Sequence, residues 1–113
     1  MGSSWIRNDK RTAIYLRDGF ACVYCGCAHD EQDAPLTLDH LQARNLGGNN
    51  EAKNLVTACL SCNSSKQDLP MKDWYRNLAD RGVDVSELPQ KIRRHTRRSL
   101  NLKAARQLIA ARA

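Results

Sequence analysis

Aromatic side chains are scarce in this sequence, where they make up 5% of 113 residues. A chain of this length forms one modest hydrophobic core, and so few aromatic residues predict a thin one. Apolar runs are also short, and none approaches the roughly 20 residues that a membrane-spanning helix needs. The N-terminus lacks the apolar segment of a secretory signal peptide. These absences argue against a membrane protein and favour a single cytoplasmic domain over residues 1–113.

Acidic residues are missing from the last part of the chain. Eight basic residues follow position 90, and the net charge of +6 comes entirely from this segment. They are Lys91, Arg93, Arg94, Arg97, Arg98, Lys103, Arg106 and Arg112. Such a block is typical of a phosphate-binding surface, here chiefly Arg93, Arg94, Arg97 and Arg98. A solvated helix face is the alternative, but it lacks the glutamates that usually balance such a face.

Cysteine is better represented, and four of the five cysteines form two Cys-x-x-Cys pairs. The pairs are Cys22 with Cys25 and Cys59 with Cys62. Two thiolate pairs at this spacing predict a tetrahedral structural zinc site. Two disulfides are the alternative, but nothing in the sequence marks the chain as secreted. Cys27 is left over, either as a bystander thiol or in place of Cys25, and His29 is a weaker candidate ligand.

The segment between the two pairs is longer than a zinc ribbon needs. Cys59 lies 34 positions after Cys25, whereas zinc ribbons usually have about 15–20 residues between their pairs. The additional residues must form structure of their own, and they carry Asp39, His40 and Asn54. The cysteine pairs are therefore predicted to close a functional insert.

Within this insert, the residue pattern predicts a strand, a loop, a second strand and a helix. Alternation at residues 36–38 indicates a strand that ends at Asp39, and residues 55–58 indicate the second strand. Residues 47–50 read Gly-Gly-Asn-Asn, which is typical of a turn. A helix is expected over residues 62–67. Polar groups from each part are predicted to converge near the zinc site.

Further helices are expected on both sides of this unit. Apolar spacing and capping residues predict helices over residues 8–18 and 71–80, and a later one that Ser86 caps. Ser99 is expected to cap a last helix from Leu100 to about residue 111. The fold class is therefore α+β and mainly helical. A helical C-terminal extension is expected over residues 70–113, basic from residue 91.

A series of short motifs runs through the first two thirds of the chain. They are the helix over 11–17, Asp18-Gly19-Phe20, Cys22-x-x-Cys25-Gly26, Leu38-Asp39-His40, Gly47-Gly48, Asn54-Leu55 and Cys59-x-x-Cys62-Asn63-x-x-Lys66. In this order they resemble the HNH endonucleases, which have the ββα-metal fold. The resemblance implies a nuclease core over residues 7–67, with a structural zinc ion and flanking helices, and a DNA substrate.

The resemblance also implies a role for each polar residue of the insert. His40 would be the general base, Asp39 a ligand of a catalytic divalent ion, and Asn54 the residue that orients His40. Asn63 stands at the position of the last histidine in the name HNH, and it would supply the second ligand of the catalytic ion. Its amide oxygen suits Mg²⁺, Mn²⁺ or another hard divalent ion. The expected reaction is hydrolysis of a phosphodiester bond by water that His40 activates.

Several interpretations stay open. Arg44 and Lys66 are candidates for phosphate contacts, or are plain surface charges. A zinc-ribbon module that binds nucleic acid without cleaving it explains the cysteines and the basic tail, but not Asp39, His40 and the two asparagines together. The C-terminal helix could dock a partner such as a phage packaging enzyme, and a homodimer is also open. For a phage protein, the expected location is the host cytoplasm.

Overall fold

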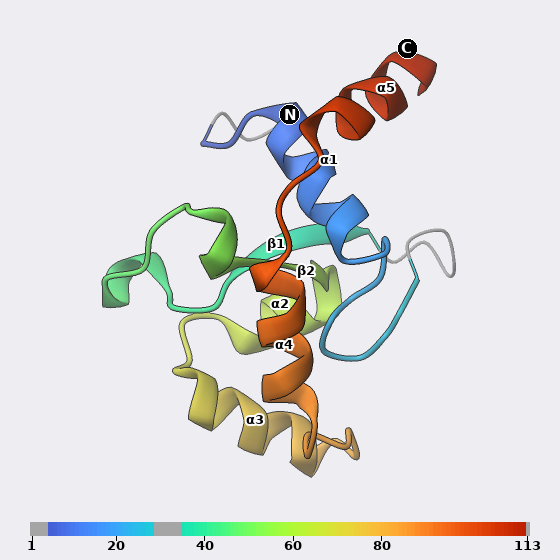
Figure 1. The fold of residues 1–113 in the computed structure, drawn as a ribbon. Coiled ribbons are helices and arrows are strands. Elements are labelled where there is room, and N and C mark those ends of the chain that lie inside the picture. Colours follow the sequence, from blue (N-terminus) through green and yellow to red (C-terminus); the bar gives the residue numbers. More distant parts are fainter. Residues whose placement is uncertain (1–4, 29–34, 113) are drawn as a thin grey trace.

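The computed structural model describes residues 5–28 and 35–112, and Figure 1 shows their arrangement. Along the chain lie α1 (Asn8–Arg17), β1 (Leu36–His40), the short 3-10 helices η1 (Arg44–Leu46) and η2 (Ala52–Asn54), β2 (Leu55–Cys59), α2 (Leu60–Lys66), α3 (Met71–Asp80), α4 (Leu88–Arg97) and α5 (Leu102–Arg112). The prediction of a mainly helical α+β fold is confirmed. Among the described helices, none has both the length and the apolar character to cross a membrane.

The two strands form an antiparallel hairpin, and α2 follows the second strand directly. Leu36 pairs with Cys59, and His40 pairs with Leu55. This register places His40 at one end of the hairpin and the zinc-site Cys59 at the other. The hairpin therefore holds the two predicted sites at a fixed separation.

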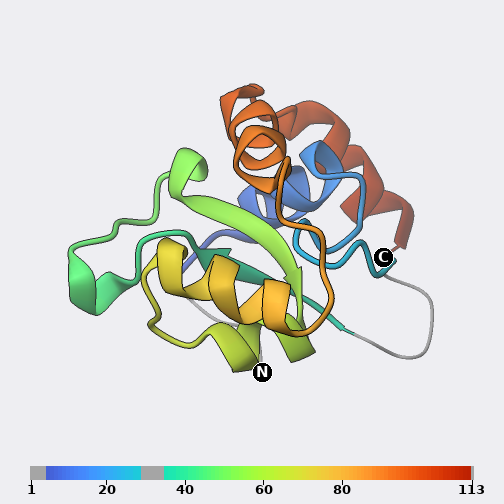
Figure 2. The ribbon, with the colours of Figure 1, turned by 90° about the horizontal axis from the view of Figure 1, so that it is seen from below.

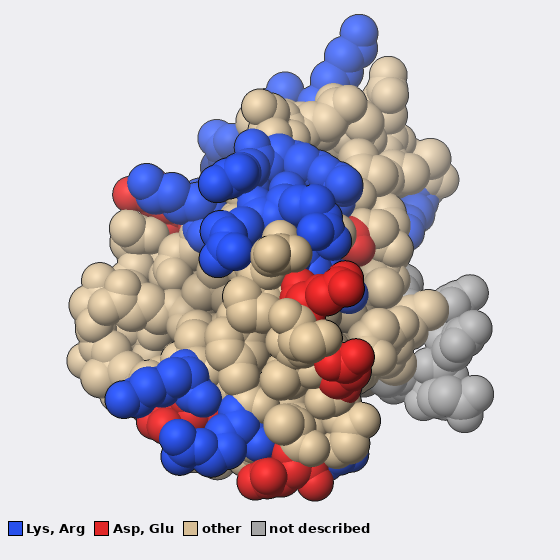
Figure 3. All heavy atoms as spheres, turned by 60° about the horizontal axis from the view of Figure 1, so that its bottom comes forward, with Lys and Arg blue, Asp and Glu red and all other residues tan. Residues whose placement is uncertain are grey.

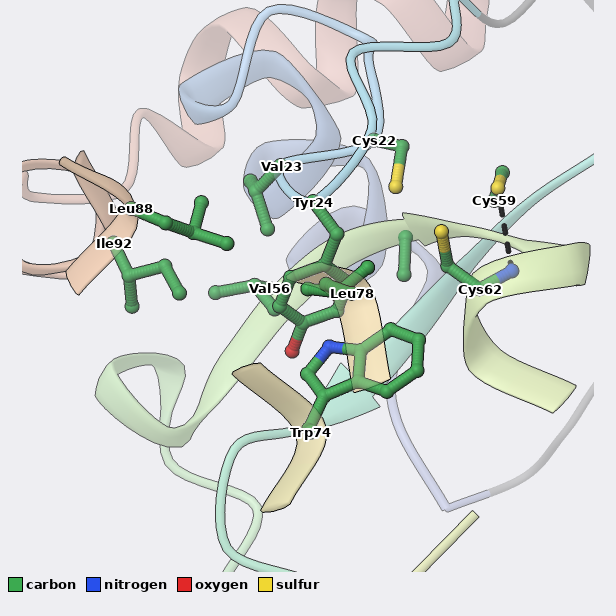
Figure 4. Packing of buried hydrophobic residues seen from close by; sticks show 11 residues of the cluster. Cys22, Val23, Tyr24, Val56, Cys59, Cys62, Trp74, Leu78, Leu88 and Ile92 are labelled. Atoms are coloured by element: carbon green, nitrogen blue, oxygen red, sulfur yellow. Dashed lines mark hydrogen bonds between the residues drawn. The ribbon is translucent and has the colours of Figure 1, made fainter. Parts of the chain in front are cut away.

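Helices cover both faces of the hairpin, which explains why all five residues of β2 are buried. One face packs against α1 through Ile6, Ile14, Leu38 and Leu55. The other face packs against α3 and α4, and Figure 4 shows this cluster of Cys22, Val23, Tyr24, Val56, Ala58, Cys59, Cys62, Trp74, Leu78, Leu88 and Ile92. Trp74 and Leu78, four positions apart, are 0% and 1% exposed and form the buried apolar stripe of α3.

The helices at the two edges of the hairpin have different neighbours. α2 lies against β1, where Asn63 donates hydrogen bonds to Thr37 and to the Leu38 carbonyl. α4 lies against β2, where Leu88 and Ile92 join the cluster that contains Val56. Figure 2 shows α4 and α2 on opposite sides of the hairpin, while α1 and α5 lie side by side.

Two helices begin later than the capping residues predict. α4 begins at Leu88, so Ser86 is not its cap. α5 begins after Asn101, whose side-chain oxygen accepts a hydrogen bond from the Ala104 amide at 2.9 Å. Asn101 therefore takes the capping role that was predicted for Ser99, since an asparagine caps at least as well as a serine.

Candidate active site and metal centre

The four cysteines of the two pairs lie together, as their spacing predicts. The sulfur atoms of Cys22, Cys25, Cys59 and Cys62 all lie within 4.8 Å of one another. The Cys25 and Cys59 sulfurs are 3.8 Å apart, which is about the edge length of a tetrahedron with the Zn–S distance of ~2.3 Å. The donor set and its dimensions fit a structural zinc ion.

Backbone amides also point at these sulfurs. The Cys25 amide donates to Cys22 Sγ at 3.5 Å, and the Cys62 amide donates to Cys59 Sγ at 3.4 Å. The second bond makes Cys59 the N-cap of α2, which therefore begins at Leu60 and not at Cys62. Each pair thus forms a tight turn that favours thiolate over thiol, because an N–H donor stabilises negative charge on sulfur.

The pKa values of three of these thiols are shifted by burial and by hydrogen bonds between the sulfurs. Hydrogen bonding with Cys62 lowers the pKa of Cys22 to about 5, while burial raises the pKa of Cys25 to about 11. The pKa of Cys62 is also raised, chiefly by its hydrogen bond with Cys22. One thiolate therefore suppresses ionisation of its neighbours, and a divalent ion between the sulfurs is what allows all four to ionise.

Cys27 lies outside the cluster, where its thiol points at the Ala28 carbonyl at 3.7 Å. This position agrees with a bystander thiol and leaves Cys25 as the fourth sulfur of the cluster. All five cysteines are free thiols in this structure, as a thiolate zinc site requires. His29, the weaker candidate ligand, lies outside the described residues.

The polar residues of the insert line a cleft at the other end of the hairpin. The cleft has a volume of about 420 Å³ and lies between β1, η1 and α2. Its lining residues are Leu38, Asp39, His40, Ala43, Arg44, Asn45, Asn63, Gln67 and Asp68. Three of the four predicted catalytic residues, Asp39, His40 and Asn63, therefore share one cavity.

Asp39 is buried within this site and is held by two donors. Its carboxylate accepts a hydrogen bond from the Tyr24 hydroxyl, and Lys66 Nζ lies 3.3 Å from Oδ2 and 3.4 Å from Oδ1. Burial raises the pKa of Asp39, and the Lys66 ammonium opposes that shift. A carboxylate oxygen has two lone pairs, so these bonds leave capacity for a metal ion.

Lys66 does not occupy the surface position that a phosphate contact requires. Its side chain is 0% exposed, and Nζ also donates to the His40 carbonyl at 2.9 Å. We therefore assign Lys66 to the site as the buried countercharge of Asp39. Arg44, in contrast, is exposed in η1 and lines the cleft, as a phosphate contact requires.

The side chains of Asn63 and Asn54 have different hydrogen-bond partners. Asn63 Nδ2 donates to Thr37 Oγ1 at 2.8 Å and to the Leu38 carbonyl at 3.1 Å, which leaves its side-chain oxygen for a ligand. An Asp39 carboxylate and an Asn63 carbonyl form an all-oxygen donor set, which fits a hard divalent ion. Asn54 instead holds the loop: its side chain bonds Gln42 N, Gln42 O and Asn49 O.

Asn50, for which the sequence predicts only a place in a turn, is hydrogen-bonded to the His40 ring, and the Trp5 ring packs against that ring. His40 Nε2 and Asn50 Oδ1 are 2.8 Å apart. Asn54, which the resemblance implies orients His40, bonds the neighbouring segments: its carbonyl accepts from the Leu41 amide, and its side chain donates to the Asn49 carbonyl. Asn50 and Tyr24 are site residues that the sequence does not predict, since no spacing signal marks either one.

The three arginines of α4 and Arg98, which follows it, lie away from the cleft. Arg93, Arg94, Arg97 and Arg98 are all exposed, and Figure 3 shows Lys and Arg side chains gathered over α4. Because α4 covers the β2 edge while the cleft opens beside β1, this surface lies across the hairpin from Asn63. Arg98 has a structural contact as well, since it donates to the Arg17 carbonyl at 3.4 Å.

Comparison with known proteins agrees with this geometry. Residues 22–69 match the model of the family described as HNH endonuclease. The CRISPR-associated endonuclease Cas9 of Corynebacterium diphtheriae is 34% identical over 83 residues, which are 68% of this chain and 7% of that protein. Cas9 of Actinomyces naeslundii is 34% identical over 76 residues, which are 66% of this chain and 7% of that protein.

A smaller relative is the SPbeta prophage-derived protein YoqL of Bacillus subtilis, 31% identical over 62 residues. The match covers 50% of this chain and 27% of YoqL. The chain thus spans only a small part of the length of the curated relatives that it matches. No solved structure gives a significant match.

An antiparallel hairpin, the helix that follows it and a four-cysteine cluster define a ββα-metal type of nuclease domain. Residues 22–69 therefore form an HNH endonuclease domain, and the chain is similar to a segment of Cas9.

Proposed function

We propose that this chain is a metal-dependent endonuclease that hydrolyses phosphodiester bonds of DNA, with His40 as the general base. The observation that carries the proposal is the shared cleft. It brings an imidazole from His40, a carboxylate from Asp39 and an amide oxygen from Asn63 into one cavity. A module that only binds nucleic acid has no need for this combination.

The oxygens of Asp39 and Asn63 would hold a divalent ion such as Mg²⁺ or Mn²⁺. When bound, the ion supplies charge stabilisation at the scissile phosphate and at the leaving oxygen. Asp39 is preorganised for this task, because Tyr24 and Lys66 fix its carboxylate from the buried side. The zinc ion at the far end of the hairpin has a structural role, since four thiolates leave it no open position.

His40 would take a proton from the attacking water. His40 lines the cleft from the end of β1, and its backbone carbonyl accepts a hydrogen bond from the Lys66 ammonium. A neutral imidazole within hydrogen-bond reach of water is a suitable general base near neutral pH. The exposed guanidinium of Arg44 would contact a phosphate oxygen of the bound strand.

Replacement of Asp39 by asparagine is expected to reduce the cleavage rate by more than about 100-fold at a fixed Mg²⁺ concentration. An amide lacks the charge that holds a hard ion, and loss of even an outer partner of a metal ligand costs about 10–100-fold. Asparagine is preferred to alanine because alanine would remove the side-chain partner of the buried Lys66 ammonium, which would keep the His40 carbonyl alone among the described residues. Single-turnover cleavage across a Mg²⁺ titration measures the effect.

The control for this variant is Asp80→Asn, at the end of α3 and outside the cleft. Zinc content should equal that of the wild type in both proteins. Mild chelation should likewise stop wild-type cleavage before zinc leaves, because two oxygen ligands bind far more weakly than four thiolates. Loss of zinc and of activity at the same chelator concentration would contradict separate metal sites.

The basic face of α4 would supply affinity for the phosphate backbone and take no part in the chemistry. No acidic residue lies between Leu88 and the end of the chain, so its positive charge is not offset within the segment. Its place across the hairpin from the cleft means that it would contact phosphates other than the scissile one. Arginines on a helix give mostly sequence-independent affinity.

Reversal of Arg93 and Arg97 to glutamate is therefore expected to weaken DNA binding and to flatten its salt dependence. On duplex DNA, the slope of log K against log salt becomes shallower by about 0.9 for each phosphate that the protein no longer neutralises. The matched control replaces Lys72 and Arg76 by glutamate, because they are an exposed basic pair with the same spacing on α3. Equal salt slopes for the two double variants would assign the α4 face to another role.

A further inference from the structure

The imidazole of His40 is held on more than one side. Its Nε2 lies 2.8 Å from Asn50 Oδ1, and its ring centroid lies 5.1 Å from that of Trp5. Trp5 in turn lies under the Arg11 guanidinium, 5.7 Å from the ring centroid. The ring contact limits tilting of the imidazole, while the hydrogen bond determines which nitrogen carries the proton.

The neighbours of Asn50 decide the direction of that hydrogen bond. Arg44 Nη1 lies 3.1 Å from the same Oδ1 atom. A guanidinium can only donate, so the Asn50 atom between Arg44 and His40 must be the accepting oxygen. Rotation of the amide would set its NH₂ group against the guanidinium, with two donors facing each other. His40 Nε2 must therefore be the donor to Asn50.

A neutral imidazole has a single N–H. If Nε2 carries that hydrogen, Nδ1 of His40 is left with a lone pair. A general base needs such a lone pair within reach of the water that it deprotonates. The contact with Asn50 thus selects the tautomer in which Nδ1 is the basic atom.

Asn50 is fixed in place although it lies in a loop. Lys10, on α1, donates from Nζ to the Asn50 carbonyl at 2.8 Å. The preceding residue is held too, because Asn54 Nδ2 donates to the Asn49 carbonyl at 2.8 Å. Gly48 lets the loop return close to β1: an added Cβ there would lie 1.7 Å from the Gln42 carbonyl oxygen.

We infer that Asn50 is a positioning residue for the cleavage reaction: it holds His40 in the Nε2–H tautomer and leaves Nδ1 free to accept the proton of water. This inference rests on the proposed role of His40 as the base. Asn50 acts through His40 and has no contact with the reacting atoms in this role. Its replacement should reduce the rate of the chemical step and leave substrate binding nearly unchanged.

The tautomer of His40 can be measured directly in the full-length, zinc-loaded protein without a catalytic ion. Long-range ¹H–¹⁵N correlation spectra separate a protonated from a bare ring nitrogen. They are recorded at about pH 8.5, above the range near 6.5 where histidine usually titrates. The chain has three histidines, and the His40 signals are those that disappear in His40→Ala. The expected result for the wild type is a protonated Nε2 and a bare Nδ1.

Variants connect this tautomer to the rate. Asn50→Leu, similar in size but without an acceptor, should cleave about 10–100-fold more slowly, with KM within about twofold of the wild type. It should also lose the preference for the Nε2–H tautomer. Asn50→Asp keeps an acceptor and should keep the tautomer. Asn49→Leu is the control, because within the described part of the chain the Asn49 side chain bonds only Glu51.

The outcomes separate this inference from the function on which it rests. Undiminished cleavage by His40→Ala would remove His40 as the base, whatever Asn50 does. An inactive His40→Ala together with a wild-type rate in Asn50→Leu would show that Asn50 is dispensable. A wild-type spectrum with the proton on Nδ1 would overturn the inference. Because that measurement needs no variant of Asn50, the inference can be tested even if Asn50→Leu fails to fold.

Discussion

Replacement of His40 by alanine is expected to slow phosphodiester cleavage by about 10²–10⁴-fold, the usual contribution of a general base. The fold should survive, because His40 is only half-buried and lies at the end of β1, away from the four thiols. Zinc content and circular dichroism should therefore match the wild type. Single-turnover cleavage of a labelled DNA duplex in Mg²⁺ measures the rate.

The control for this variant is His95→Ala, which removes a histidine on α4 far from the cleft. His95 Nδ1 lies 3.2 Å from the Asp18 carboxylate, so its role is in packing α4 against the end of α1. His95→Ala is expected to cleave at nearly the wild-type rate wherever it remains folded. A His40→Ala protein that cleaves as fast as His95→Ala would remove His40 from the mechanism.

Replacement of Cys59 by serine is expected to cost both the zinc ion and the fold. Structural zinc binding contributes on the order of 10 kcal/mol or more to folding in small domains, which exceeds the margin of a thin core. Cys59 is 3% exposed and directly precedes α2, so loss of the zinc ion would free the start of the helix that carries Asn63. Metal analysis and circular dichroism of the purified variant measure the effect.

Cys27→Ser provides the matched control, because Cys27 lies next to the cluster but outside it. One zinc ion per chain and a wild-type spectrum are expected for this control. A Cys59→Ser protein that folds without zinc would show that the metal is not structural. Disulfides among these cysteines in the isolated wild type would contradict the zinc site itself.

Features that depend on local spacing could be predicted from the sequence. Two Cys-x-x-Cys turns present their sulfurs to one point whatever lies between them, so the cluster followed from the motif alone. The α3 stripe followed from Trp74 and Leu78 at helical spacing, which face the core together. The motif order predicted that Asp39, His40 and Asn63 converge, but it placed them near the zinc site, whereas their cleft lies at the other end of the hairpin.

Features that depend on contacts between distant segments could not be predicted. Arg17 resembles a surface arginine in the sequence, yet it is buried and bonds Asp18 at 2.8 and 3.1 Å and the Leu55 carbonyl at 2.7 Å. Lys66 is buried for the same kind of reason: Asp39, 27 positions earlier, supplies its countercharge. Asn50 acquires its role only when the loop returns to β1.

Conversion of supercoiled plasmid to nicked circle tests the central claim most directly. The wild-type protein, purified with its zinc, is incubated with plasmid in Mg²⁺, in Mn²⁺ and without an added divalent ion, beside His40→Ala. We predict nicking by the wild type that depends on the added ion, and almost none by His40→Ala in any condition. If the folded, zinc-loaded wild type nicks the plasmid in none of these ions, the assignment of this chain as a nuclease is contradicted. If His40→Ala nicks it equally fast, the assignment of His40 as the base is contradicted.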